Sequence, residues 1–248
     1  MLTSLWTTEE FIANFHDYLN QLNPTLERLF SMNTETLVST PGAKQEIIKV
    51  FYVLRGVLRG LNQSKHFNLF FDWFYPQYLA VIIEGSLRAF YTDDDVVMVV
   101  LKFLTELVHN RNNRLRFDTW SINGLIVFKE TAKYVVELLR QWDCMRAKAT
   151  SNDQYLSKWK YVRQFVDLYH KMISGNYINF AICEYYNDDI FSVLTQCIFT
   201  MISSASVRQL KAYEKVNQKV FTMVNHFFQH HLEIMFLKFD VPLIEGTL

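Results

Sequence analysis

The stretch that decides the fold class spans Leu101–Phe117 and reads LKFLTELVHNRNNRLRF. Its first half continues an apolar stripe that begins at Val97 and recurs every three or four residues, the spacing of one face of an α-helix. The polar run at 109–113 interrupts this stripe. Positive charge is concentrated in and after the run, at Arg111, Arg114 and Arg116. The segment therefore predicts an amphipathic helix that ends in a basic loop.

The composition of the whole chain favours helices in the same way. Of 248 residues, 50% are hydrophobic and 16% aromatic, whereas there are only seven glycines and four prolines. Few helix breakers among many leucines, valines, isoleucines and phenylalanines argue against a turn-rich β fold. A chain of this length also buries enough surface, about 70–75% of that of the unfolded chain, to need no disulfide or metal.

Helical periodicity recurs along the chain between short polar or proline-containing breaks. In the first half of the chain we expect a helix from the cap at 7–10 to Leu22, followed by helices over about 24–38, 43–62, 65–74, 77–91 and 93–108. The next helix runs from the turn at 121–124 to the polar linker at 143–152. Further helices are expected over about 154–174, 188–203, 207–231 and from 232 to the end. Thr92 is expected to cap the helix whose first turn contains Asp93, Asp94 and Asp95. Gly56 and Gly60 weaken their helix and would permit a neighbouring helix to approach closely.

Helix, short break and helix alternate with no strand pattern or Gly-rich hairpin signal. Successive helix pairs of irregular length, some near 40–47 residues, predict an all-α, HEAT-like solenoid of helical hairpins that forms one array over residues 1–248. A compact helical bundle is the alternative, although the chain has no heptad seam. Because apolar residues crowd the last turn, we expect the chain to be a fragment of a longer protein or a gene product cut short.

Charge and cysteine content limit the classes of partner and compartment. The 25 acidic and 25 basic residues balance, which argues against a general nucleic-acid binder. No secretory signal is present and no apolar run approaches the ~18 residues that span a bilayer, so no membrane partner is expected. Three widely spaced cysteines form no metal-ligand pattern and suggest a reducing compartment.

Catalytic and cofactor motifs are missing from the sequence, and we predict no enzyme, cofactor or metal. The strongest competing pattern is His226 and His230, which lie one helical turn apart and could bind zinc in a metal-using all-α enzyme. Phe227 stands where such an enzyme carries its general base, and no third ligand is evident. Asp188 and Asp189 are explained by helix capping, and Cys183 by burial as an inert thiol.

The basic loop is the main candidate for partner contact. Arg111, Arg114 and Arg116 can grip acidic side chains or phosphates through bidentate hydrogen bonds. The alternative is structural: these arginines cap the preceding helix and pair with Glu106, Asp118 or a neighbouring repeat. The acidic turn Asp93–Asp95 is the second candidate contact surface, and capping of its own helix is again the alternative.

Three blocks of sequence resemble the exportin-7 (Ran-binding protein 16/17) family of importin-β-like receptors. They are Leu69–Tyr78, Leu101–Thr131 with its Val-His-Asn-Arg, Asn-Gly and Phe-Lys-Glu-Thr groups, and Ser174–Phe180 together with Tyr186–Asp189. Their order and rough spacing agree with the family, most densely over residues 67–131. Ile122 takes the place of a family proline, and residues 142–159 depart strongly.

The resemblance implies a HEAT-repeat receptor that carries protein cargo through nuclear pores under control of the GTPase Ran. It implies as partners Ran in its GTP form, protein cargo and nucleoporins, with shuttling between nucleus and cytoplasm. The matching segment falls in the central-to-C-terminal half of such receptors, away from their main Ran-binding region. A helical scaffold or adaptor unrelated to transport remains the alternative function.

Overall fold

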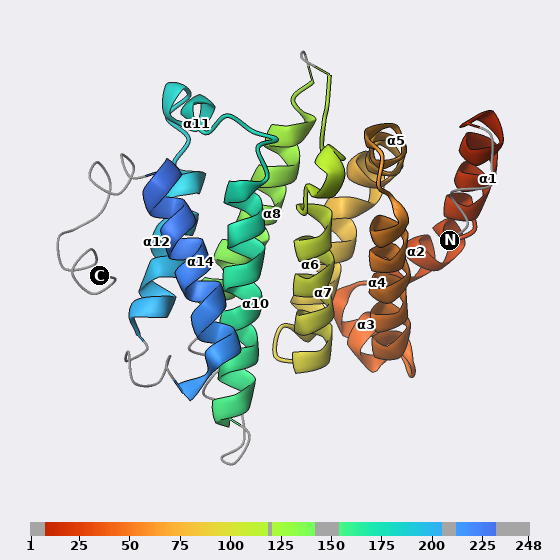
Figure 1. The fold of residues 1–248 in the computed structure, drawn as a ribbon. Helices are drawn as coiled ribbons and strands as arrows, with labels where there is room; N and C mark the ends of the chain where they lie inside the picture. The colour runs from red at the N-terminus through yellow and green to blue at the C-terminus, as the bar shows by residue number, and fades with distance from the viewer. Residues whose placement is uncertain (1–7, 119–120, 142–153, 205–211, 232–248) are drawn as a thin grey trace. The chain divides into compact units, whose positions relative to one another are not determined.

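A computed structural model of the chain describes residues 8–118, 121–141, 154–204 and 212–231. The regular structure of these residues is helical throughout, without a β-strand (Figure 1). The elements, with π-helix η2 and 3-10 helix η3, are α1 (Thr8–Asn20), α2 (Asn23–Phe30), α3 (Thr34–Ser39), α4 (Ala43–Gly60), α5 (Ser64–Phe74), η2 (Tyr75–Leu79), α6 (Ala80–Phe90), α7 (Asp94–Leu107), η3 (Arg111–Asn113), α8 (Asn123–Arg140), α10 (Gln154–Ser174), α11 (Ala181–Tyr185), α12 (Ile190–Ser203) and α14 (Glu214–His230). The predicted linker at 143–152 and the helix from 232 lie outside the described residues.

The chain divides into two compact units. Unit 1 comprises Met1–Leu107 and Arg111–Phe117, and unit 2 comprises Val108–Asn110 and Asp118–Leu248. The basic loop therefore contributes its arginines to unit 1.

The core of unit 1 is built around two helices, α4 and α7, that pack along each other in parallel. Lys44 at the start of α4 pairs with Asp93, which directly precedes α7, while Arg59 at the end of α4 pairs with Glu106 at the end of α7. Between these ends the Phe51 and Phe103 rings meet edge to face at 5.5 Å. Helix α6 packs against α3, α2 and α7.

Pro76 does not separate two helices as the sequence suggested. The chain stays helical from α5 through η2 into α6, with a π-helical turn at Tyr75–Leu79. Proline lacks the N–H that the α-helical ladder needs, and a local π turn is one way for a helix to accommodate such a defect. Phe67, Phe70, Phe71 and Phe74 of α5 are buried.

The glycines of α4 do not serve close packing, so that prediction was wrong. A Cβ atom added at Gly56 or Gly60 would meet no atom within 4 Å. Gly56 is exposed on α4 and only lowers its helix propensity.

Unit 2 repeats the parallel packing of alternate helices. Helix α14 lies along α10, and α12 lies along α8 (Figure 1). Trp159, near the start of α10, stacks on Tyr213, just before α14, whereas His170 meets His226 nearer the ends of the same helices.

In both units, the parallel stacking of every second long helix is the pattern of helical-hairpin repeats. The prediction of an all-α, HEAT-like fold is therefore confirmed. None of the described helices is both long enough and apolar enough to cross a membrane.

Candidate functional site

Arg114, a member of the predicted basic surface, is completely buried in unit 1. Its guanidinium donates hydrogen bonds to the backbone carbonyls of Leu58 and Leu61, the second at 3.1 Å, and to the carbonyl of Glu106. The same group lies 5.4 Å above the centre of the Phe67 ring. One side chain thus binds carbonyls at the ends of both α4 and α7, where a helix leaves carbonyls short of intrahelical donors.

The guanidinium remains charged in this position. Burial, and secondarily the positive charge of Arg111, lower the pKa of Arg114 to about 9, which is still above neutral pH. A cation is suited to helix C-terminal ends, where the backbone carries partial negative charge. Arg114 is therefore a structural clamp between α4 and α7.

Glu106 is the carboxylate on which the arginines converge. Its side chain is only 8% exposed. Its Oε1 atom pairs with Arg111, and with Arg114 at 3.4 Å, while its Oε2 atom pairs with Arg59 at 3.4 Å. Both carboxylate oxygens are thus engaged, as a nearly buried charge requires.

The structure separates the three arginines that the sequence grouped. The partner-contact prediction does not hold for Arg114, because a fully buried side chain cannot reach a partner. Arg111 pairs with Glu106 and keeps 29% of its side chain exposed, whereas Arg116 is exposed. The structural alternative, capping of a helix end and pairing with Glu106, is confirmed for Arg114, and the pairing for Arg111.

Helix α4 contributes to this site in a way that the sequence did not predict. Arg59 shares Glu106 with the basic loop, and Arg55 lies one helical turn before Arg59. No local signal links residues 55–59 to residues 106–114. The link follows from the parallel packing of α4 and α7, which only the tertiary structure gives.

The acidic turn at 93–95 serves first as a helix cap. The Asp93 Oδ1 atom accepts hydrogen bonds from the backbone N–H groups of Asp95 at 3.1 Å and Val96 at 3.2 Å. Asp93 therefore caps α7, one residue later than the predicted cap Thr92.

Lys44 of α4 reaches this turn as well. Its ammonium lies 2.6 Å from Asp93 and 3.3 Å from Asp95. The hydrogen bond to Asp93 is the main reason why the pKa of Lys44 is raised. Asp95 keeps 76% of its side chain exposed and remains accessible to a partner.

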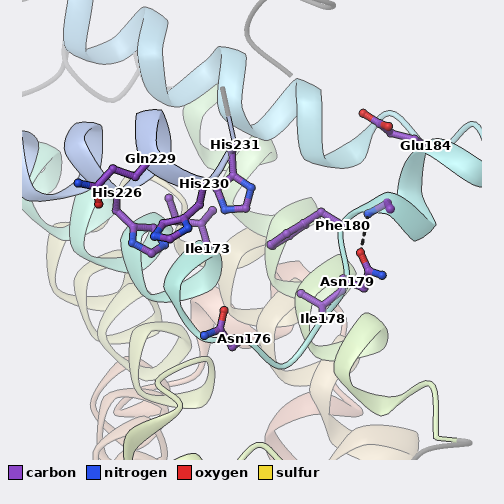
Figure 2. A pocket seen from close by; sticks show the side chains of 11 residues that line it. Ile173, Asn176, Ile178, Asn179, Phe180, Glu184, His226, Gln229, His230 and His231 are labelled. Atoms are coloured by element: carbon purple, nitrogen blue, oxygen red, sulfur yellow. Dashed lines mark hydrogen bonds between the residues drawn. The ribbon is translucent and has the colours of Figure 1, made fainter. Parts of the chain in front are cut away.

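Unit 2 contains a pocket of about 690 Å³ next to a group of histidines (Figure 2). The His226 and His230 rings lie 4.5 Å apart, and His231 meets Phe180 edge to face at 5.2 Å. Ile173 and Gln229 also line this space.

The pocket does not provide the ligand set of a metal enzyme. Across the part of the chain that the structure describes, no group of three or more His, Cys, Asp or Glu side chains could hold a metal ion. The pKa values of His170, His226 and His231 are lowered, mainly because these side chains are partly buried. The pairing of His226 with His230 therefore lacks the third ligand that a zinc centre would need.

Asp188 and Cys183 have structural roles, whereas the side chain of Asp189 makes no capping hydrogen bond to α12, so capping was the wrong explanation for Asp189. Asp188 accepts a hydrogen bond from the backbone N–H of Ile190 at 3.1 Å and pairs with Lys129 of α8. Cys183 is buried, and burial raises the pKa of its thiol. A raised pKa lowers the thiolate fraction, so this cysteine has the properties of an inert thiol.

Comparison with known proteins gives a consistent result. The chain is 28% identical over 217 residues to Exportin-7 from Dictyostelium discoideum, a match that covers 88% of this chain and 21% of that protein. It is 27% identical over 245 residues to Ran-binding protein 17 from Homo sapiens, covering 98% of this chain and 22% of the relative. It is 26% identical over 221 residues to Exportin-7-B from Xenopus laevis, covering 89% of this chain and 20% of that relative.

No family model matches the chain, and no solved structure matches it. The chain spans about a fifth of the length of these curated relatives. Over roughly nine-tenths of its residues it is thus similar to the exportin-7 and Ran-binding protein 16/17 family of nuclear transport receptors, as a segment of that family would be.

Proposed function

We propose that this chain is part of a nuclear transport receptor that carries protein cargo through nuclear pores under the control of Ran in its GTP form. The observation that carries the proposal is the similarity along nearly the whole chain to proteins named Exportin-7 and Ran-binding protein 17. The partners are then Ran, protein cargo and nucleoporins, and the receptor shuttles between nucleus and cytoplasm.

The mechanism is surface binding without bond chemistry. Residues 1–248 form one repeat array in this proposal, and partners bind to the exposed side chains of its helices and loops. The HEAT-like packing supports this, because such repeats present extended surfaces. Arg111 and Arg116 of the basic loop and Asp94 and Asp95 of the acidic turn are the proposed contact residues, and Arg114 supports the loop from within.

The decisive experiment is biolayer interferometry of the purified chain against Ran loaded with GTP or with GDP at physiological salt. GTP-selective binding is the expected result and would place a Ran contact within this segment. Equal binding to both forms, or binding to neither, would contradict a Ran contact here. Capture of immobilised nucleoporin repeats then separates a transport receptor from a scaffold, because a scaffold unrelated to transport would bind neither Ran nor nucleoporins.

A further inference from the structure

Three arginines gather on the surface of unit 1 around Glu106. Arg59 and Arg111 pair with opposite oxygens of this carboxylate, and Arg55 lies one turn before Arg59 on the same helix. Residues four apart in a helix are surface neighbours, so Arg55 and Arg59 present their guanidinium groups side by side. We call Arg55, Arg59 and Arg111 the arginine cluster.

The local charges of the cluster do not balance. Three guanidinium groups, those of Arg59, Arg111 and the buried Arg114, pair with a single carboxylate, Glu106, whose two oxygens are thereby engaged. Arg55 adds a fourth positive charge next to Arg59. The helix-end carbonyls, which could offset positive charge, are taken by Arg114. The cluster therefore carries surplus positive charge.

Partial burial makes this surplus of positive charge costly. Burial and the nearby charge of Arg59 both lower the pKa of Arg55 and of Arg111. The Nε atoms of Arg55 and Arg111 are buried and have no hydrogen-bond partner among the described residues. Like charges held together cost free energy, and an anion bound at the accessible ends of these guanidinium groups would offset that cost.

We propose that the arginine cluster binds a run of carboxylates in an extended, acidic segment of a partner protein. Guanidinium groups bind carboxylates through paired, charge-assisted hydrogen bonds. The Cβ atoms of Arg55 and Arg59 are about 5–6 Å apart by helix geometry. Alternate residues of an extended peptide are separated by about 7 Å, so alternating acidic side chains can meet successive arginines.

A protein segment fits this cluster better than a nucleic acid does. Nucleic-acid binders typically neutralise about 6–10 phosphates. The cluster offers three accessible arginines, and Glu106 already reduces their charge. The inference requires only the surface of unit 1, and so it stands or falls separately from Ran binding.

Fluorescence anisotropy with the full chain tests the inference. The probe is a labelled peptide of alternating Glu and Ser residues, and its control replaces every Glu with Gln. We expect the acidic peptide to bind, and its affinity to fall as salt is raised from about 50 to about 200 mM. The Gln peptide should not bind. Equal binding of both peptides, or of neither, would overturn the proposal.

Variants then locate the site. The double variant Arg55→Gln, Arg59→Gln should weaken binding of the acidic peptide by about tenfold or more, whereas Arg59→Lys, which keeps the charge, should weaken it less. The matched control is Arg88→Gln, which removes an exposed arginine of unit 1 that pairs with Glu84, and it should change affinity by less than about twofold.

Two outcomes would count against the arginine cluster. An equal loss with Arg88→Gln would mean that only the net charge of the chain matters. Tighter binding of a single-stranded oligonucleotide, abolished by the same double variant, would assign the cluster to nucleic acid instead. Thermal melting of each variant establishes that its fold is intact, and Arg59→Lys provides the test if the double variant does not fold.

Discussion

The guanidinium of Arg114 donates a hydrogen bond to the backbone carbonyl of Leu58, 56 residues earlier in the chain. This bond joins the basic loop to the last turn of α4, and bonds from the same group to Glu106 join the loop to α7. A residue that looks like part of a binding surface in the sequence is therefore the clamp on which that surface rests.

Loss of the clamp should destabilise the chain strongly. Arg114→Met removes the buried donor of the Leu58, Leu61 and Glu106 backbone carbonyls. We expect a loss of about 3 kcal/mol in the free energy of unfolding, because each buried polar group left unsatisfied costs about 1–3 kcal/mol. Urea unfolding followed by circular dichroism measures it.

The control for this prediction is Arg116→Met in the same loop. Arg116 is exposed, so its replacement should change stability by no more than about 0.5 kcal/mol. Equal effects of the two variants would show that Arg114 does not act as a clamp.

Gly56→Ala should stabilise the chain. Gly56 lies inside α4, and an added Cβ would meet no atom within 4 Å. The expected gain is about 0.5–1 kcal/mol, because alanine loses less backbone entropy on forming a helix. Differential scanning calorimetry would record a higher Tm.

Gly85→Ala is the matched comparison within α6. A Cβ there would approach the Phe30 ring to 3.1 Å, closer than most Cβ contacts. This variant should gain less stability than Gly56→Ala, or lose some. A larger gain at Gly85 than at Gly56 would contradict the prediction that the Phe30 ring crowds an added Cβ at Gly85.

Acidification should weaken unit 2. Burial lowers the pKa of His170, His226 and His231 in the folded state, so the unfolded chain binds protons at a higher pH than the folded chain does. Stability from these groups is complete above the unfolded pKa of about 6.5 and decreases as pH falls from there toward the folded pKa values. Thermal unfolding measured between about pH 8 and pH 5 should show this decrease.

The His226→Gln variant checks the cause. Removing one of these histidines should make the decrease in Tm with falling pH less steep. The control His16→Gln, which lies outside this group of histidines, should leave the slope unchanged. An unchanged slope in His226→Gln would mean that other groups produce the pH dependence.

Charge reversal at exposed positions tests the proposed contact surfaces. If Ran in its GTP form binds this segment through the basic loop, Arg116→Glu should weaken binding by about tenfold without lowering the Tm, because one favourable charge contact becomes repulsive. Asp95→Lys makes the corresponding test of the acidic turn, where 76% of the Asp95 side chain is exposed. Unchanged affinity in interferometry would remove that residue from the contact surface.

Much of the fold could be predicted because it depends on local periodicity. The stripes of apolar residues located the long helices such as α4 and α10, since each helix buries one face. The continuity through Pro76 could not be predicted, because it depends on a π-helical turn that local rules treat as a break. The cap of α7 was placed one residue early for a similar reason: Thr92 and Asp93 are both good caps, and only the geometry selects Asp93.

The candidate site was harder to predict than the fold. Arginine is rarely buried, so Arg111, Arg114 and Arg116 looked equivalent in the sequence. What distinguishes Arg114 is that the ends of two helices meet around it, and this depends on contacts between segments about 50 residues apart. Arg55 and Arg59 were missed for the same reason.

The ion pairs at the two ends of α4 and α7 also fix how these helices can move. Lys44 binds Asp93 at one end, and Arg59 binds Glu106 at the other, where Arg114 also donates to the Leu58 carbonyl of α4. Sliding one helix past the other by a single turn, about 5.4 Å, would separate the pairs at both ends at once. The ion pairs at the two ends consequently favour the present register of these helices over one shifted by a turn.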